Sequence, residues 1–334
     1  MFQPTIGFGA QAADLIAQAT QVINNEIAIP YDENNHATRE LTRWQPLTEL
    51  LFFLTGGITI GTANATALKP GGALNLIDEL VLSLDNDFQL MKLPGRYFRI
   101  LSHLYDRHKR TATEPGLTVG SHPIAHGFAF PIDVGGGYSA LDASQANILA
   151  VDCKWASPSK VLTPAGTTTL AVNAGTQLKI QTKSLGGYPS GERGGVNFPY
   201  LRHMWQYNNR TITASGEDRF TLTKRRLYSG LALFANDAND VATDGIVTNI
   251  KLQVGTTVIK TWDPEVLRDE NIKQYKIQDP ADMTGVYVIP WGEREQIEHQ
   301  VSITGGQEME LVYETSTTGK LVLAQDYFLA PVNA

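Results

Sequence analysis

Short segments in which apolar and polar residues alternate recur along most of the chain. Residues 80–84 read Leu-Val-Leu-Ser-Leu and residues 177–181 read Gln-Leu-Lys-Ile-Gln, a period close to two. This period is typical of a half-buried strand, because successive side chains of a strand point to opposite faces. Glycine, proline and asparagine clusters separate the segments. The predicted strands lie within 50–60, 74–84, 127–132, 148–155 and 167–182, then within 227–234, 246–259, 286–290, 300–304, 309–313 and 320–328.

The first thirty residues show a different pattern. Apolar residues recur there at helical spacing on one face of residues 12–27, and Pro30 with the polar stretch 31–36 closes the segment. The spacing predicts one N-terminal amphipathic helix. Its apolar face consists of Leu15, Ile16, Ala19, Val22, Ile23 and Ile27.

The chain also contains an internal repeat. Residues 57–60 match residues 230–233 at a constant offset of 173, and after a slip of three residues the match continues at an offset of 170. Pro94 and Pro264 correspond, and each opens a helix-like stretch, 95–105 and 265–275. The alternative to a true repeat is chance similarity between two β-rich segments, in which alternating apolar and polar residues match easily. Such alternation does not explain the matched prolines and glycines. The repeat predicts a duplicated β-domain.

Composition narrows the functional classes. Only 18% of the 334 residues are charged, against about 25% in typical soluble domains, while 42% are hydrophobic. The chain is therefore not of the disordered class, and a surface so poor in charge favours assembly with other chains. The net charge of −7 gives no basic excess for neutralising phosphates, so we expect no direct nucleic-acid binding.

Cysteine content and the first basic residue bear on where the chain is made. Cys153 is the only cysteine, which excludes an intrachain disulfide and a cysteine-based zinc site and fits a reducing compartment. Lys and Arg are absent before Arg39, so a charged secretory leader is not expected. The most apolar run, 50–54, is far shorter than the roughly 20 residues of a membrane span. We expect synthesis in a reducing cytosol.

Few residues indicate a chemical site. His122 and His126 have a gap that resembles a metal-ligand pair, but Pro123 breaks the helix that this spacing requires. Asp237, Asp240 and Asp244 offer several oxygens that fit calcium, with a polar turn between strands as the alternative. We expect no catalytic residues, no cofactor and no metal apart from this weak calcium candidate.

The tandem pattern of an apolar strand pair, a hairpin at 85–87 or 255–257, and a proline-led helix resembles the double jelly-roll major capsid proteins of tailless icosahedral viruses. Tectivirus- and corticovirus-like phages with an internal membrane are the nearest in length. The resemblance covers about 44–330 and implies an all-β fold of two tandem jelly-roll β-sandwiches with a short N-terminal amphipathic helix. The expected domains are an arm with this helix at 1–43, a first jelly roll at 44–215 and a second at 216–334. The boundary falls in a loop-rich stretch, 183–224, that either finishes the first sandwich or bridges both.

The resemblance also implies a function. Capsid proteins of this kind form homotrimers, which are pseudo-hexagonal capsomers that tile an icosahedral shell. The resemblance therefore implies that this chain is a structural virion protein and not an enzyme. Its expected partners are its own copies, other capsid proteins such as penton or spike, and an internal viral membrane. In the family the N-terminal helix lies near the membrane. Here the helix lacks basic residues, which favours docking of Leu15, Ile16, Val22, Ile23 and Ile27 on a neighbouring subunit instead.

Two other classes remain open. A tandem β-sandwich that binds carbohydrate or a receptor, such as a virion spike, would share the strand pattern. A jelly-roll enzyme of the cupin type is less favoured, because its His-x-His and glutamate ligand set is missing from the sequence. Capsid proteins form trimers and arrays, spikes bind glycans or cells, and cupins hold a metal, so these properties distinguish the three.

Overall fold

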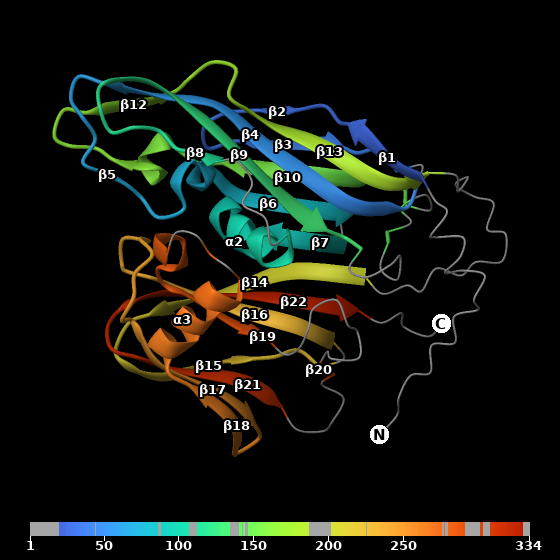
Figure 1. Ribbon diagram of the computed structural model, residues 1–334, viewed down its shortest axis with the longest axis vertical. Helices are drawn as coiled ribbons and strands as arrows, with labels where there is room; N and C mark the ends of the chain where they lie inside the picture. The colour runs from blue at the N-terminus through green and yellow to red at the C-terminus, as the bar shows by residue number, and fades with distance from the viewer. Residues whose placement is uncertain are drawn as a thin grey trace.

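The structure is a computed structural model, and most of its ordered elements are β-strands. It describes residues 20–43, 45–85, 88–106, 112–133, 140–141, 143, 146–186, 202–224, 226–275, 277, 280–290, 301–302 and 308–329. Two β-sandwiches lie one after the other along the long axis of the molecule, with helices α2 and α3 on the side nearest the viewer (Figure 1).

The first sandwich is built from residues 20–186. One sheet has the order β1-β13-β4-β9-β8, with β2 on β13 and β12 on β4, and the facing strands have the order β3-β10-β6-β7. Its elements are β1 (Thr20–Asn25), β2 (Ile29–Pro30), β3 (His36–Glu40), β4 (Leu47–Gly61), β5 (Ala67–Leu68), η1 (Gly72–Leu76), β6 (Ile77–Leu84), β7 (Phe88–Leu93), α2 (Gly95–Asp106), β8 (Ala112–Thr113), β9 (Gly120–Pro131), β10 (Leu149–Trp155), η2 (Pro158–Lys160), β11 (Leu162–Thr163), β12 (Thr169–Val172) and β13 (Gln177–Gly186).

The second sandwich is built from residues 202–329. Strands in the order β14-β22-β16-β19, with β20 on β16, face a sheet of order β15-β21-β17-β18. Its elements are β14 (Arg202–Ile212), β15 (Gly216–Thr221), β16 (Arg226–Asn236), β17 (Val247–Val254), β18 (Thr257–Trp262), α3 (Pro264–Gln274), η3 (Pro280–Met283), β19 (Val286–Pro290), β20 (Val301–Ser302), β21 (Met309–Thr315) and β22 (Gly319–Leu329).

The strand orders confirm the duplication. The order β1-β13-β4-β9 in the first sandwich corresponds to β14-β22-β16-β19 in the second, and β3-β10-β6-β7 corresponds to β15-β21-β17-β18. Each helix occupies the same place in its copy, with α2 between β7 and β9 and α3 between β18 and β19. Eight strands and one helix therefore repeat in the same order, which is the two-sheet arrangement of a jelly roll.

Both helices begin where the prolines predict. Pro264 is the first residue of α3, and the carboxylate of Asp263 caps this helix by accepting from the backbone N–H groups of Glu265 and Val266. Gly95 starts α2, and a Cβ there would lie 2.7 Å from the carbonyl oxygen of Leu74. Only glycine therefore lets α2 pack this closely on η1.

The core is continuous through both sandwiches. The alternating strands bury their apolar faces, and the buried side chains of the two lobes form one contiguous cluster. Cys153 lies in this core on β10, as the sequence predicts for a strand residue, and burial raises the pKa of its thiol. None of the described helices has the length and apolar character needed to span a bilayer.

The predicted N-terminal helix is wrong for the part of it that the structure describes. Residues 20–25 form strand β1, which pairs antiparallel with β13 from Thr20 opposite Gly186 to Asn25 opposite Gln181. β-branched residues favour a strand, and this long-range pairing supplies backbone hydrogen bonds that override the helical spacing of the apolar residues. Leu15 and Ile16 lie outside the described residues.

The pairing also bears on the domain limits. β1 and β3 are edge strands of the two sheets of the first sandwich, so the strands within residues 20–40 belong to that sandwich in the structure. β14 pairs antiparallel with β22 from Arg202 opposite Leu329 to Ile212 opposite Gly319. The boundary at 215/216 stays a prediction, and it would separate β14 from the strand with which it pairs along its whole length.

Candidate assembly site

The two sandwiches meet where β7 and β14 run parallel in the middle of a nine-stranded sheet (Figure 1). The register places Trp205 of β14 opposite Met91 of β7, and both side chains are fully buried. Beside them the Tyr207 hydroxyl donates a hydrogen bond to Glu79 Oε2 of β6 at 2.8 Å. One sheet therefore continues from the first lobe into the second.

Aromatic side chains from both lobes fill the space behind this sheet. The ring centroid of Trp205 lies 5.2 Å from that of Phe98 on α2 and 4.9 Å from that of Phe130 on β9, both in edge-to-face geometry. The His203 ring stacks between Phe130 at 5.5 Å and Phe328 of β22 at 4.8 Å. Such pairs add to the free energy gained from burying the rings, so this cluster stabilises the contact between the lobes.

A buried acid lies at the centre of the cluster. Asp326 Oδ1 is 2.8 Å from His203 Nε2, and His203 Nδ1 is 2.5 Å from the carbonyl oxygen of Pro131. A carbonyl oxygen only accepts, so Nδ1 carries a hydrogen and donates it. Burial raises the pKa of Asp326 well above its ordinary value. The acid proton is therefore kept within the pair, on Asp326 or on His203 Nε2, and the pair is neutral as a whole.

A network of charged side chains forms the polar part of the junction. Asp240 lies in the connection between β16 and β17, and its backbone has a left-handed φ of 63°. Arg96 at the start of α2 donates to the backbone oxygen of Asp240 and to its Oδ1, each at 3.1 Å. Lys160 of η2 lies 3.9 Å from Oδ2 and Lys320 of β22 lies 3.6 Å from Oδ1. Asp240 is thus shared by three cations, two of them in the first sandwich.

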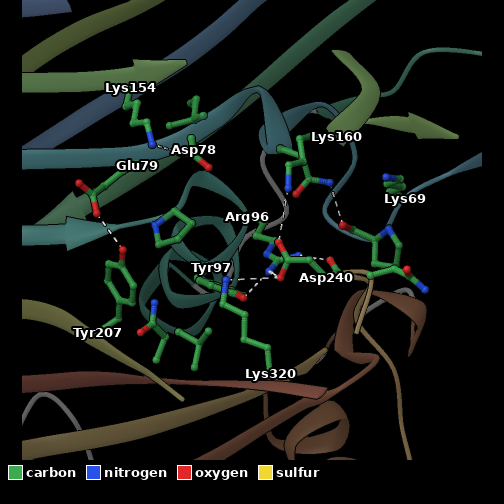
Figure 2. A pocket seen from close by; sticks show the side chains of 17 residues that line it. Lys69, Asp78, Glu79, Arg96, Tyr97, Lys154, Lys160, Tyr207, Asp240 and Lys320 are labelled. Atoms are coloured by element: carbon green, nitrogen blue, oxygen red, sulfur yellow. Dashed lines mark hydrogen bonds and ion pairs between the residues drawn. The ribbon is translucent and has the colours of Figure 1, made fainter. Parts of the chain in front are cut away.

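Figure 2 shows this network in a cavity of about 260 Å³ between the lobes. Five basic and three acidic side chains line the cavity, and Asp240 points toward Arg96, Lys160 and Lys320. The ion pair between Lys154 and Asp78 lies apart from Asp240 in this view. Within this cavity, the ion pairs between the sandwiches therefore all involve the carboxylate of Asp240.

Replacing this carboxylate is expected to weaken the junction. Asp240→Asn retains the backbone oxygen that accepts from Arg96 but leaves that largely buried guanidinium without its charged partner. We expect a loss of about 1–3 kcal/mol in the free energy of unfolding, measured by urea denaturation. Asp78→Asn is the matched control, because it breaks the exposed pair with Lys154 and is expected to cost about 0–1 kcal/mol. Equal losses in the two variants would contradict the role of Asp240.

A second polar link joins α2 to the second lobe. Arg99 of α2 lies 3.6 Å from Asp282 of η3 and 3.4 Å from Glu114. Glu114 also accepts from the backbone N–H of Ala73 at 2.7 Å and lies 3.2 Å from His126 Nε2. Burial alone would raise the pKa of Glu114, but these donors and nearby cations outweigh it, so the pKa is lowered. The carboxylate therefore stays charged and fixes α2 at the junction.

Two sheet edges carry exposed apolar side chains. β18 pairs with β17 on one side only and β1 pairs with β13 on one side only, among the strands that the structure describes. Val258 and Ile259 of β18 are 49% and 59% exposed, and Ile23 of β1 and the nearby Ile27 are 55% and 72% exposed. Exposed edges with large apolar residues are sites where another chain adds to a sheet.

The structure places three of the five predicted assembly residues, Val22, Ile23 and Ile27, on or next to strand β1. Ile23 is on the exposed face of β1, Ile27 follows the strand with its side chain also exposed, and Val22 is half-buried. Leu15 and Ile16 are not among the described residues. Docking of these residues on a neighbouring subunit stays a prediction, now for a strand edge instead of a helix face.

The predicted calcium ligands do not converge. Asp237 accepts from the backbone N–H groups of Asn239 and Val241, and Asp240 is held by the cations described above. Asp244 accepts from the backbone N–H of Gly285 and pairs with Arg268. These contacts favour the alternative of polar turns, and calcium binding stays a prediction.

The two histidines also have other partners. His122 Nε2 lies 2.7 Å from the carbonyl oxygen of Thr118, and His126 is buried beside Glu114. Within the described ranges there is no group of three or more His, Cys, Asp or Glu side chains arranged to hold a metal ion.

The main junction residues were not singled out by the sequence. His203 and Trp205 lie in the stretch predicted to be loop-rich, and Arg96 and Asp326 belong to no motif. One signal was available for Trp205, because a tryptophan and a histidine in a polar segment are candidates for a buried contact. The partners of these residues come from segments more than 70 residues away, which a local pattern does not show.

Comparison with known proteins finds likeness at the level of structure. No protein-family model matches the sequence, and no curated protein matches it either. The major capsid protein of Sulfolobus turreted icosahedral virus superposes with a TM-score of 0.73 and 13% sequence identity, over 93% of this chain and 97% of that chain. The major capsid protein P2 of bacteriophage PM2 gives 0.59 and 12%, over 94% and 99%. The Faustovirus major capsid protein gives 0.61 and 7%, over 99% and 92%.

These likenesses cover nearly the whole of each chain, so they include both lobes and not one jelly roll alone. They agree with the duplication of eight strands and one helix described above. The chain thus has the all-β double jelly-roll fold that these viral major capsid proteins share.

Proposed function

We propose that this chain is a viral major capsid protein with a structural role and no catalytic one. The observation that carries the proposal is the joining of two complete jelly rolls into one body by the continuous sheet at β7 and β14. Solved proteins with this tandem fold include major capsid proteins of viruses as different as a Sulfolobus virus and bacteriophage PM2. A rigid pair of similar lobes is suited to tiling a surface.

The proposal includes assembly into homotrimers, which the same geometry supports. Three chains with two similar lobes each place six lobes around one axis, so a threefold object fills a nearly sixfold lattice position. The low charged fraction of 18% fits lateral surfaces that become buried, because charged residues are depleted from interface cores. The proposed partners are further copies of this chain and, at other lattice positions, penton or spike proteins.

An internal membrane and synthesis in a host cytoplasm also belong to the proposal. The membrane is supported by the resemblance to membrane-containing phages, and cytoplasmic synthesis by the single buried Cys153. Purified particles of the virus test the first point by their phospholipid content. Particles without phospholipid would remove the membrane from the proposal and leave the capsid role in place.

The direct test is electron microscopy of the purified full-length protein at rising concentration. We expect particles with a pseudo-hexagonal outline that join into sheets or closed shells. The alternative, a carbohydrate- or receptor-binding module such as a spike, predicts isolated particles that bind glycans on an array. Glycan binding without any lattice would overturn the capsid proposal.

A further inference from the structure

We propose that the cavity between the two lobes binds a small oxyanion that carries a phosphate group. The cavity is the one in Figure 2, where α2 of the first sandwich meets the connection between β16 and β17 of the second. Such a ligand binds the single chain, so the site does not depend on the proposed function.

The side chains that line the cavity carry an excess of positive charge. Five basic and three acidic side chains lie there, in a chain whose net charge is −7. Two of the acids have cations of their own, because Asp78 pairs with Lys154 and Glu79 pairs with Lys92 of β7 at 3.5 Å. Asp240 is then the one carboxylate left for four lining cations, which are Lys69, Arg96, Lys160 and Lys320. A phosphate group carries about −1.5 to −2 charges at pH 7, which would neutralise most of this excess.

Asp240 does not saturate the lysines around it. Arg96 donates to its carboxylate at 3.1 Å, but the ammonium groups of Lys160 and Lys320 are 3.9 and 3.6 Å from the nearest carboxylate oxygens. These distances exceed those of a hydrogen bond, and an ammonium has three donors. Within the described ranges, the side chains of Lys69, Lys160 and Lys320 form no hydrogen bond. Their donors are therefore available to the oxygens of a ligand.

The three lysines come from both lobes and can be reached from solvent. Lys69 lies between β5 and η1, Lys160 lies in η2, and Lys320 lies on β22 of the second sandwich. Figure 2 shows Lys69 and Lys160 above Asp240 and Lys320 below it. The side chains of Lys160 and Lys320 are 52% and 38% exposed, so a small solute can contact both. An anion bound between them would bridge the two lobes beside the Asp240 network.

The size of the cavity and the helix beside it also fit a phosphate group. The volume is about 260 Å³, against about 30 Å³ for one water molecule, so the five heavy atoms of a phosphate fit with room for water. The start of α2 lines the cavity through Pro94 and Tyr97, and the first turn of this helix contains no acidic residue. The positive end of the helix dipole therefore adds to the attraction that the lysines exert on an anion.

Equilibrium dialysis of the full-length protein against radiolabelled inorganic phosphate, at a fixed concentration of sodium chloride, tests the proposal. We expect saturable binding of one phosphate per chain. The double variant Lys160→Gln with Lys320→Gln is expected to bind about tenfold more weakly, because it removes two charged donors. Lys154→Gln is the matched control, since Lys154 lines the same cavity but is paired with Asp78. No saturable binding by the native protein, or an equal loss of affinity in the double variant and the control, would overturn the site.

Asp240→Asn gives a second readout of opposite sign. This variant removes the negative charge nearest to the proposed ligand, so we expect it to bind phosphate more tightly although it is less stable to urea. A folding defect alone would weaken binding, so the two effects are separable. Weaker binding by folded Asp240→Asn protein than by the native protein would contradict the placement of the ligand beside this carboxylate.

Competition distinguishes two sources of the phosphate group. Displacement of the label by glucose 6-phosphate at lower concentrations than by unlabelled inorganic phosphate would assign the site to a phosphate ester. Displacement at equal or higher concentrations would assign it to free phosphate, and both results support the site. Label that unlabelled phosphate does not displace would overturn it. A protein that binds no phosphate but forms capsomers would overturn the site and leave the proposed function intact.

Discussion

Trp205→Ala is expected to lower the free energy of unfolding by about 3–5 kcal/mol and to uncouple the two sandwiches. A buried tryptophan replaced by alanine loses its transfer free energy and leaves a cavity. Trp205 has no exposed surface and touches Phe98 and Phe130 of the first lobe from a strand of the second. The cavity would therefore open at the contact that makes the two lobes one body. Calorimetry is expected to resolve two transitions where the native protein shows one.

The matched control is Trp155→Ala. Trp155 is equally buried, but it lies on β10 inside the first sandwich, where it packs edge-to-face with Tyr31 at 5.3 Å. We expect a similar loss of stability with a single transition, because the junction is untouched. A Trp205→Ala protein that unfolds in one transition, within 1 kcal/mol of the native value, would show that the aromatic cluster does not couple the lobes.

The stability of the native protein is expected to fall as the pH rises above about 6.5, by up to about 1.4 kcal/mol per pH unit. The raised pKa of Asp326 means that the folded pair with His203 keeps its acid proton. In the unfolded chain an aspartate has lost that proton above about pH 4, and a histidine loses its own above about pH 6.5. Above pH 6.5 the folded state therefore holds one proton more than the unfolded state, and raising the pH favours unfolding until the pair itself ionises.

Asp326→Asn isolates this effect. An asparagine side chain can donate to His203 Nε2 while Nδ1 continues to donate to the Pro131 carbonyl, so the site stays neutral and hydrogen-bonded. As the pH rises above about 6.5 we expect the native protein to lose stability relative to this variant, measured by urea denaturation at each pH. Parallel stability curves for the two proteins would contradict a retained proton.

Much of the fold was predictable because the sequence contains an internal repeat and because apolar and polar residues alternate along its strands. The period of two in 80–84 and 177–181 identified β6 and β13, and the matched Pro94 and Pro264 identified both helices and the duplication. These signals are local, or they depend on comparing the chain with itself. Each follows from burial of one strand face or from the fixed φ of proline.

The sequence-based predictions missed strands that the local pattern of apolar and polar residues does not indicate. β14 contains the run Tyr207 to Arg210, which is polar, and only its pairing with β22 and its contact with β7 make it a strand. β1 has apolar residues whose spacing fits a helix, and the pairing with β13 decides in favour of a strand. The junction contacts of the candidate site could not be predicted for the same reason, since Asp240 and Arg96 are 144 residues apart in the sequence. Long-range partners, not propensity, place these residues.

Whether this chain forms capsomers is tested by the mass of the native protein in solution, measured by light scattering on the peak from a sizing column. We expect a species of three times 36.6 kDa that persists on dilution and joins into larger arrays as the concentration rises. A stable monomer of 36.6 kDa at every concentration would contradict the assignment of this double jelly roll to a capsid shell.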